Sequence, residues 1–368
     1  MSRSIRILGS MTGTSCDGID LACLEIGAAN WRTLWTQSES YPASLKKRVL
    51  KLQEPRHSVR LRDLLDLDRD LGLWYAKVMK GAISRHRLKR PLAIANHGQS
   101  VSDFPKRGSV GTSLQLGSPA IIARETGLTV VSNFRSGDMA AHGQGAPLAP
   151  IFHEMIASSL GLTQQGVAIH NIGGISNLTY IGRGRVMAFD TGPGNMWIDA
   201  ATLLATKGKQ SFDRGGLLAG HGAIDIAALK RILTLPYFSE APPKSTGRDD
   251  FPFELLLRAS HKRNVDLIAT ASAVTAWSIA AAYRRWILQK KLPLRNIFVC
   301  GGGAKNHYLL SLIQDNLPEV QVRPLEEVSS LSGEFIEAAA FSYLGYLSLL
   351  GKPVGGQWTG ARDSHPRA

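Results

Sequence analysis

A glycine-rich loop between two short apolar strands is the sequence feature that most constrains how this chain can fold. Residues 9–20 read GSMTGTSCDGID and contain three glycines, two threonines and two serines. Glycines let the backbone turn tightly and approach a ligand closely, and successive N–H groups beside hydroxyls form a nest for anionic oxygens. The loop therefore predicts a phosphate site, although a plain solvent-exposed hairpin would also account for its glycines.

The segment after this loop indicates which kind of phosphate site to expect. Apolar residues fall at Ile19, Leu21 and Cys23, which is the two-residue period of a strand. A Walker loop or a Rossmann turn opens a helix instead, so both motifs are disfavoured. A phosphate held in the elbow of a β-hairpin is the arrangement of the actin-like sugar kinases and chaperone ATPases.

Length and composition favour a globular chain of about two domains. It has 368 residues, of which 44% are hydrophobic, enough for a core in each domain. We find no run of 18 apolar residues and no secretory signal, so we expect no membrane span and no membrane partner. The three cysteines, at 16, 23 and 300, form no C-x-x-C pair, which disfavours disulfides and zinc and favours a reducing cytoplasm.

The charge balance favours anionic ligands. The net charge of +14 attracts such ligands by electrostatic steering. The basic residues are spread along the chain, and no basic stripe interleaved with aromatic residues is visible, so we expect no nucleic-acid partner.

Residues 166–190 repeat the architecture of residues 4–37. In the first half we expect strands at 4–8, 19–26 and 31–37, and in the second half strands at 167–170, 178–181 and 186–189 around a glycine loop at 171–177. The two sequences are not alike, and two unrelated hairpins would read the same way. An internal duplication is what the actin-like fold requires, with two hairpins that clamp one polyphosphate.

The other elements complete an α/β pattern. We expect helices at 43–54, 59–84, 118–126, 151–160, 195–206, 222–234, 253–263, 270–290 and 334–350, and strands at 92–96, 128–132 and 297–300. We interpret residues 133–150 as a loop that crosses between domains. The predicted fold is the actin-like ATPase (ASKHA) fold, with two RNase H-like domains around a central cleft, formed by residues 1–135 plus 340–368 and by residues 136–339.

Three acidic or basic positions are candidates for chemistry. Asp190 ends a predicted strand before a sharp turn, where it would be either a turn cap or a general base in the cleft. Arg135 and Asp138 would form either a salt bridge within their loop or a substrate contact, in which Arg135 offers a bidentate fork to a carboxylate.

Further polar residues have alternative roles. Asp17 and Asp20 flank Gly18, and one of them could hold Mg²⁺ while the other is a hairpin residue. His97 is either a polar wall of the site or a structural histidine, and Glu337 is a candidate for a sugar or ribose contact. The polar segment 244–249 is either a solvent loop or a cover over a ligand. For Cys16, a space-filling role is preferred to a catalytic thiol.

Seven blocks of sequence together resemble one family, the anhydro-N-acetylmuramic acid kinases of bacterial cell-wall recycling. The blocks are GSMTGTSCDGID, NHGQS, NFRSGDMAAHGQGAPLAP, NIGGISNLT, FDTGPGN, KSTGRD and CGGGAKN, and the likeness covers residues 9–350. Asn133 stands where an aspartate is usual and Ser100 where a threonine is usual, which bears on the shape of the sugar pocket.

The resemblance implies a function and a set of site residues. It implies a phosphotransferase with an alcohol acceptor that uses ATP and Mg²⁺ to open 1,6-anhydro-N-acetylmuramic acid and to phosphorylate O6, with Asp190 as the base. The ATP-binding residues implied are Gly13, Thr14, Ser15, Cys16, Asp17, Gly18, Ile19, Asp20, Asn171, Gly173, Gly174, Gly301, Gly302, Gly303 and Asn306. The substrate-binding residues implied are His97, Gln99, Arg135, Asp138, Gly192, Asn195 and Glu337, and Asp17 is the metal candidate.

Two rival functions stay open at the level of sequence. One is a kinase for an ordinary hexose or hexosamine with a free hydroxyl, and the other is an actin-like ATPase that drives binding of a protein partner. Otherwise we expect small-molecule partners only, with the chain acting as a cytoplasmic homodimer.

Overall fold

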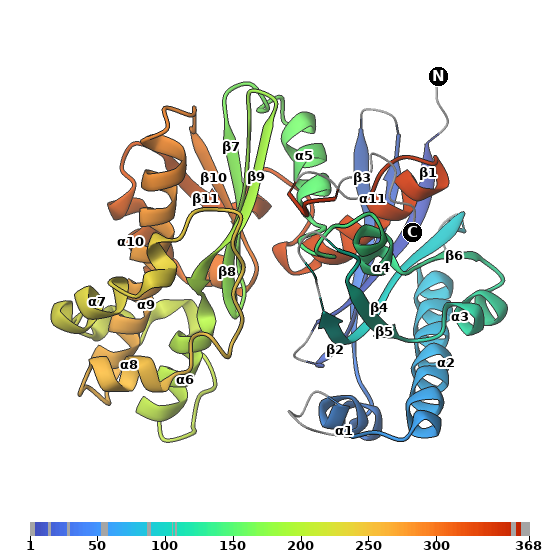
Figure 1. The fold of residues 1–368 in the computed structure, drawn as a ribbon, viewed down its shortest axis with the longest axis horizontal. Helices are drawn as coiled ribbons and strands as arrows, with labels where there is room; N and C mark the ends of the chain where they lie inside the picture. Colours follow the sequence, from blue (N-terminus) through green and yellow to red (C-terminus); the bar gives the residue numbers. More distant parts are fainter. Residues whose placement is uncertain are drawn as a thin grey trace. The chain divides into compact units, whose positions relative to one another are not determined.

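The computed structural model of the chain describes residues 4–13, 16–27, 30–52, 58–86, 90–104, 106, 109–354 and 358–361. Its backbone contacts divide the chain into two compact units. Unit 1 comprises Met1–Met155 together with Phe335–Ala368, and unit 2 comprises Ile156–Glu334. Each unit is one β-sheet with helices packed on it (Figure 1).

The sheet of unit 1 is built on an antiparallel meander. Strands β1 (Ile5–Thr12), β2 (Gly18–Ile26) and β3 (Trp31–Ser40) pair in sequence order, and β4 (Ala93–Phe104) lies parallel to β1. The other edge of β4 is shared by two strands. β6 (Thr129–Val131) runs parallel to its first part, and β5 (Thr112–Leu116) runs antiparallel to its second part.

The last helix of the chain closes unit 1. The helices of this unit are α1 (Ala43–Leu52), α2 (Leu61–Arg85), α3 (Pro119–Thr126), α4 (Phe134–Ala140) and α11 (Ile336–Leu349), with α5 (Pro150–Ser159) at the unit boundary. Helix α11 lies directly on β1, so that a Cβ at Gly9 would overlap the carbonyl oxygen of Ala338. The Ser342 hydroxyl donates a hydrogen bond to the Ala22 carbonyl at 2.7 Å. Small residues therefore allow the helix backbone to approach the strands.

The sheet of unit 2 repeats the order of unit 1. Strands β7 (Val167–Ile172), β8 (Ile175–Gly182) and β9 (Arg185–Pro193) form the meander. β10 (Asn296–Cys300) lies parallel to β7, and β11 (Gln321–Pro324) lies parallel to β10. Meander, parallel centre and parallel edge thus recur in both units. The predicted duplication and the α/β, actin-like fold class are confirmed.

One buried helix organises the core of unit 2. The helices of this unit are α6 (Asn195–Ala205), α7 (Ile226–Leu233), α8 (Glu254–Ala259), α9 (Val265–Tyr283) and α10 (His307–Asn316). Helix α9 continues into a π-helical turn at Arg284–Leu288. The segment Val265–Leu288 is long and apolar enough to cross a membrane, but 78% of its most apolar stretch is buried inside the protein. These surroundings are those of a core helix.

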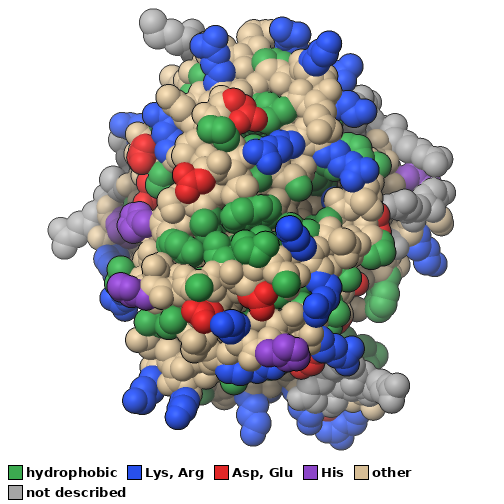
Figure 2. Space-filling model, turned by 90° about the vertical axis from the view of Figure 1, so that its left-hand side faces the viewer, with side chains coloured by type: hydrophobic (Ala, Val, Ile, Leu, Met, Phe, Trp, Pro, Cys, Tyr) green, Lys and Arg blue, Asp and Glu red, His purple; other side chains and the backbone are tan. Residues whose placement is uncertain are grey.

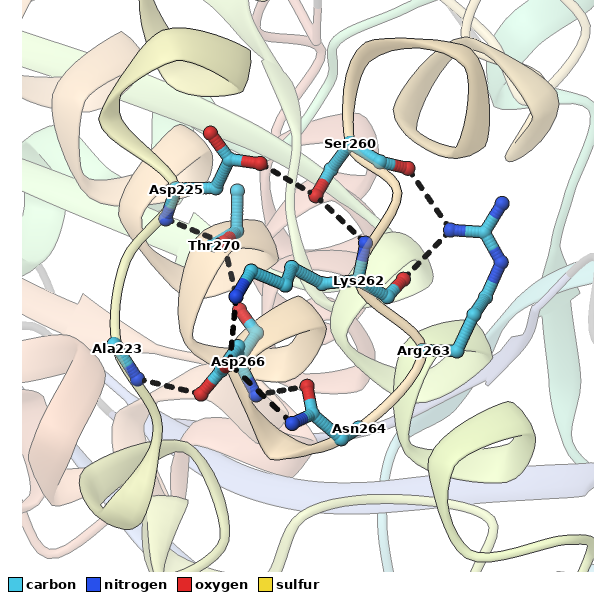
Figure 3. Close-up of polar contacts among 8 residues, drawn as sticks. All are labelled: Ala223, Asp225, Ser260, Lys262, Arg263, Asn264, Asp266 and Thr270. Atoms are coloured by element: carbon cyan, nitrogen blue, oxygen red, sulfur yellow. Dashed lines mark hydrogen bonds and ion pairs between the residues drawn. The ribbon is translucent and has the colours of Figure 1, made fainter.

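A polar cluster fixes three helices of unit 2 to one another (Figure 3). Asp225 caps α7 by accepting a hydrogen bond from the Ala228 N–H, and it also accepts one from the Ser260 hydroxyl after α8. Asp266, in the first turn of α9, accepts from the Ala223 N–H at 2.9 Å and lies 3.4 Å from the Lys262 ammonium. Each carboxylate thus joins a helix start to a neighbouring segment.

The structure differs from the sequence-based prediction at the unit boundaries. We expected 133–150 to be a loop between domains, but residues 134–140 form α4, which packs on β5 in unit 1. The boundary lies after Met155 instead of Arg135, and the chain returns to unit 1 at Phe335. The reason is that Asp138, in α4, hydrogen-bonds Thr359 at the end of the chain, which holds this segment in unit 1.

Candidate functional site

The hairpin loop of unit 1 is closed by backbone and buried side-chain contacts. The Gly13 carbonyl accepts hydrogen bonds from the Cys16 N–H and from Gln99 Nε2, both at 3.2 Å. Cys16 is fully buried and has a left-handed backbone, with φ 54°, so its space-filling role agrees with its position. Gly18 lies so close to the Glu39 carbonyl that no Cβ fits. Thr14 and Ser15, which we predicted at the phosphates, lie outside the described residues.

Gln99 supports this loop instead of facing a ligand. Its side chain is fully buried. Gln99 Oε1 accepts from the Tyr41 hydroxyl at 3.0 Å, and Nε2 donates to Gly13 and Ser100 carbonyls. Both ends of the amide are bonded inside unit 1, so Gln99 positions the loop, and its predicted substrate contact stays a prediction.

The acidic residues of the hairpin differ in their surroundings. The Asp17 side chain is 74% exposed and forms an ion pair with Lys46 at 2.8 Å. Asp20 accepts a hydrogen bond from the Ser38 hydroxyl at 2.5 Å and lies within electrostatic range of Glu337. Among the described residues, no three His, Cys, Asp or Glu side chains group as a metal site. Protein Mg²⁺ is often held by one or two carboxylates plus substrate phosphates, and Asp20 with Glu337 fits that pattern better than Asp17.

Arg135 is held in place by two acceptors. Its Nε donates to His97 Nε2 at 2.9 Å, and its Nη1 donates to the Gly145 carbonyl at 3.2 Å. Burial, together with the charge of Arg135, lowers the pKa of His97 to about 3, so the ring stays neutral and keeps an acceptor nitrogen. The two residues thus have different roles in this arrangement: His97 orients the side chain of Arg135. Glu337 is exposed on α11 and interacts electrostatically with the same guanidinium.

Asp138 is a structural partner of the chain end. It is fully buried, and its carboxylate accepts from the Gly145 N–H at 2.8 Å and from the Thr359 hydroxyl at 2.7 Å. Burial raises its pKa against the lowering effect of these two bonds. Among the described residues, the alternative salt bridge between Asp138 and Arg135 is not formed, and the predicted substrate contact stays a prediction. Asp138 instead fixes the Gly145 segment, which in turn supports Arg135.

Three glycine-rich segments of unit 2 converge on two asparagines. The loop after β7 carries Gly173 and Gly174, the segment after β9 carries Gly194, and the segment after β10 carries Gly301, Gly302 and Gly303. Asn195 Nδ2 donates to the Ile172 carbonyl at 3.0 Å, and its N–H donates to the Gly173 carbonyl at 2.7 Å. A Cβ at Gly301 would overlap Asn171 Oδ1. The predicted nucleotide residues of this half are therefore brought together.

Three predicted contact residues have packing or linking roles in this cluster. The Asn195 amide is bonded to the Ile172 carbonyl and lies close to the space where a Cβ at Gly302 or Gly303 would stand. Asn306 caps α10, accepting from the Leu309 N–H at 2.9 Å. Gly192, with φ 132°, leaves room for the ring of Phe238. Their residue types are explained by these contacts without a ligand.

Asp190 lies inside β9 and not at its end. Its Oδ2 accepts from the Thr246 N–H at 2.9 Å, and its backbone bonds Lys244 and the Tyr237 hydroxyl. Burial raises the pKa of Asp190 to about 6, and the Thr246 N–H and the Lys244 charge oppose this shift. A carboxylate with this pKa is deprotonated at neutral pH and is still a useful proton acceptor. The alternative of a turn cap does not apply, because the strand continues to Pro193.

The polar segment 244–249 belongs to this site. Thr246 holds Asp190, Lys244 lies over the Tyr237 ring at 4.1 Å, and Arg248 lies beside the space next to Gly174. Burial raises the pKa of Asp199, on α6, to about 6, and Arg248 opposes the shift. From the sequence, this segment could be either a solvent-exposed loop or a cover over a ligand. Its contacts with Asp190 favour the second role, while Tyr237 and Asp199 gave no signal in the sequence.

Unit 2 also contains a cavity of about 580 Å³, which borders this region through Phe238, the ring that lies against Gly192. Its walls include Phe238, Trp277, Arg284 and Arg285, and no predicted site residue lines it. On the face of unit 2 drawn in Figure 2, Lys and Arg side chains are scattered, and hydrophobic side chains gather near the centre.

Comparison with known proteins gives the family. A family model described as "Anhydro-N-acetylmuramic acid kinase" matches residues 5–365. The chain belongs to the anhydro-N-acetylmuramic acid kinase family. A member from Acidithiobacillus ferrooxidans is 39% identical over 95% of this chain and 87% of its own length. A member from Gloeobacter violaceus is 38% identical over 94% and 93%. The resemblance inferred from the seven sequence blocks is confirmed.

Solved structures of other proteins resemble the chain more weakly, with sequence identities of 12% and 13% for the two described next. Component A of the (R)-2-hydroxyglutaryl-CoA dehydratase of Acidaminococcus fermentans has a TM-score of 0.44 and 12% identity over 92% of this chain and 96% of its own. A ROK family glucokinase from Streptomyces griseus, in complex with glucose and AMPPNP, has a TM-score of 0.37 and 13% identity over 92% and 98%. Scores at this level bear on neither the site nor the function.

The glycine cluster predicts a difference between two alanine substitutions. Gly184 has φ 72° and open space around it, so Gly184→Ala should cost only the left-handed backbone, about 1–2 kcal/mol. Gly301→Ala adds an overlap with Asn171 and the Ile172 carbonyl, and should lower the melting temperature further and abolish stabilisation by ATP. Thermal unfolding with and without ATP measures both effects. Equal losses in the two variants, with ATP protection kept, would contradict this account of the loop.

Proposed function

We propose that the chain uses ATP to open 1,6-anhydro-N-acetylmuramic acid and to phosphorylate its O6, giving N-acetylmuramic acid 6-phosphate and ADP in cell-wall recycling. Its family makes it a kinase of this class. The observation that carries the proposal is Asp190, a partly buried carboxylate with a pKa near 6, held by the Thr246 N–H beside a cluster of glycine loops.

The chemistry needs a base for water. O6 is part of the anhydro bridge and is not a free hydroxyl, so no base can deprotonate it. Asp190 takes a proton from a water molecule that attacks C1, and the bond from C1 to O6 breaks. The departing O6 forms its new bond with the γ-phosphorus of ATP as the bond to ADP breaks. Phosphoryl transfer thus replaces the acid of an ordinary glycosidase.

The phosphates are bound by backbone N–H groups of the glycine loops. Such donors offset the charge that phosphoryl transfer spreads over the phosphate oxygens. Gly13 in unit 1 and Gly174 and Gly301 in unit 2 are the residues we assign to this role, whereas the Gly173 N–H already donates to the Ile175 carbonyl at 3.2 Å. Mg²⁺, when bound, neutralises phosphate charge, and Asp20 with Glu337 are the carboxylates that would hold it.

Arg135 is the residue we assign to the lactyl carboxylate of the sugar. A guanidinium binds a carboxylate with a fork of two donors, which requires that its plane be fixed. The bonds from Nε to His97 and from Nη1 to Gly145 fix that plane. We also propose that the protein is a cytoplasmic homodimer and that its two units are separate domains.

The decisive experiment follows solvent oxygen. The enzyme is supplied with ATP and the anhydro-sugar in ¹⁸O water, ADP release is measured by a coupled assay, and the product is analysed by mass spectrometry. We expect one ADP per product and one ¹⁸O at C1. Faster phosphorylation of a hexosamine with a free hydroxyl would favour the first rival, and ATP hydrolysis independent of any sugar would favour the second.

Asp190→Asn tests the base. The amide can still accept from the Thr246 N–H but cannot take a proton, so kcat should fall by about 10²–10⁴ while ATP binding is kept. In the unchanged enzyme, kcat/KM should rise with pH through about 6, because the raised pKa delays deprotonation. Steady-state rates from pH 5 to 8 measure both. Turnover of Asp190→Asn close to that of the unchanged enzyme would remove Asp190 from the mechanism.

Arg135→Ala tests the sugar contact. Loss of the guanidinium should raise KM for the anhydro-sugar far more than KM for ATP, because the carboxylate loses its partner. Arg85→Ala, which removes an exposed arginine on α2, serves as the control for lost positive charge. If the KM for ATP rises instead, Arg135 belongs to the nucleotide.

A further inference from the structure

A row of buried polar side chains lies behind Asp190 in unit 2. The Thr191 hydroxyl donates to the Ser176 hydroxyl oxygen at 2.8 Å, and the Ser176 hydroxyl lies 2.7 Å from His170 Nε2. His170 Nδ1 lies 3.0 Å from the Tyr283 hydroxyl, on the core helix α9. All four side chains are at most 1% exposed. Buried polar groups without partners are costly, so a continuous row of this kind fixes the positions of its members.

This row begins at an irregularity of the sheet. Between β8 and β9, Asn177 pairs with Asp190 and Ser176 pairs with Gly192, so Thr191 is an extra residue on β9. An extra residue of this kind is a β-bulge, which bends its strand and redirects the neighbouring side chain. The neighbour here is Asp190. Thr191 also lies within reach of the Ser176 carbonyl, at 3.1 Å, so both polar groups of Ser176 face the bulge.

The protons in the row balance only with a neutral imidazole. Burial lowers the pKa of His170 to about 3, so the ring carries one proton at neutral pH. When Ser176 donates to Nε2, the Nδ1–H donates to the Tyr283 oxygen, and the protons of Thr191, Ser176 and His170 each have an acceptor. A phenylalanine at position 170 would remove the acceptor of the Ser176 proton and the partner of the Tyr283 hydroxyl. The histidine therefore couples the bulge to the rigid core helix.

We propose that His170 is a positioning residue for the reaction, acting through Ser176 and Thr191 to hold the bulge that directs Asp190 at its water. The proposal rests on the proposed role of Asp190 as base. Its alternative is a purely structural row that stabilises the core without affecting catalysis. If His170 is a positioning residue, breaking the row lowers the catalytic rate. If the row is purely structural, breaking it lowers only the stability of the protein.

Thr191→Val breaks the row with almost no change of volume, and Thr202→Val is its matched control. Thr202 is a fully buried threonine of the same unit, whose hydroxyl donates to the Ile198 carbonyl within α6. We expect Thr191→Val and His170→Phe to lower kcat at least 10-fold and to move the apparent pKa seen in the rate profile, with little change in KM for ATP. Thr191→Ser should restore the rate, and Thr202→Val should keep the original kcat and profile.

The measurement separates this proposal from the proposed function. The titratable groups facing Asp190 are Lys244 and Tyr237, and neither is altered in these variants. Asp190→Asn is assayed in parallel. If Asp190→Asn loses activity while Thr191→Val keeps the original kcat and pH profile, the positioning role fails alone. If Asp190→Asn stays active, both fail. If Thr202→Val loses as much kcat as Thr191→Val, the effect is structural and the positioning role is overturned.

Discussion

The closest approaches between backbone segments determine the form of the glycine loops in both units. In unit 2 the segments after β7, β9 and β10 meet around Asn171 and Asn195, and Gly301 has no room for a Cβ there. In unit 1, Gly18 likewise has no room for a Cβ, and the hairpin is closed by the hydrogen bond from the Cys16 N–H to the Gly13 carbonyl. An oxygen-rich ligand can be bound by main-chain donors only where side chains are missing, so these glycines fix the chemistry of both loops before any charged residue is considered.

The charged residues act on a scaffold of buried polar contacts. Arg135 depends on His97 and Gly145, and Asp190 depends on Thr246. In each case a charged side chain is held by a partner whose charge does not change. Burial keeps the His97 ring neutral, and the backbone N–H of Thr246 does not titrate near neutral pH. Preorganisation of this kind spares the reaction the cost of arranging its dipoles.

The sequence allowed prediction of both meanders, of the strands that became β4, β6 and β10, and of the two glycine loops, because period-two apolar patterns and glycine clusters are local signals. The edge strands β5 (Thr112–Leu116) and β11 (Gln321–Pro324) were missed. The helix α4 was missed, since Ser136, Gly137 and Asp138 are typical of loops. The intramolecular contacts of Gln99 and Asp138 were not predicted either. Their partners lie far along the chain, 86 residues away for the Gly13 carbonyl and 221 for Thr359, and no local pattern reports such a pairing.

The contact between Asp138 and Thr359 has a consequence for the order in which the protein matures. Unit 2 is one continuous stretch, Ile156–Glu334, so it leaves the ribosome whole and can fold at once. Unit 1 must wait for α11 to cover β1 and for Thr359 to reach Asp138. A nascent chain that has not yet added Thr359 would carry a complete unit 2 and an Asp138 without this partner, so unit 1 is the later of the two units to be completed.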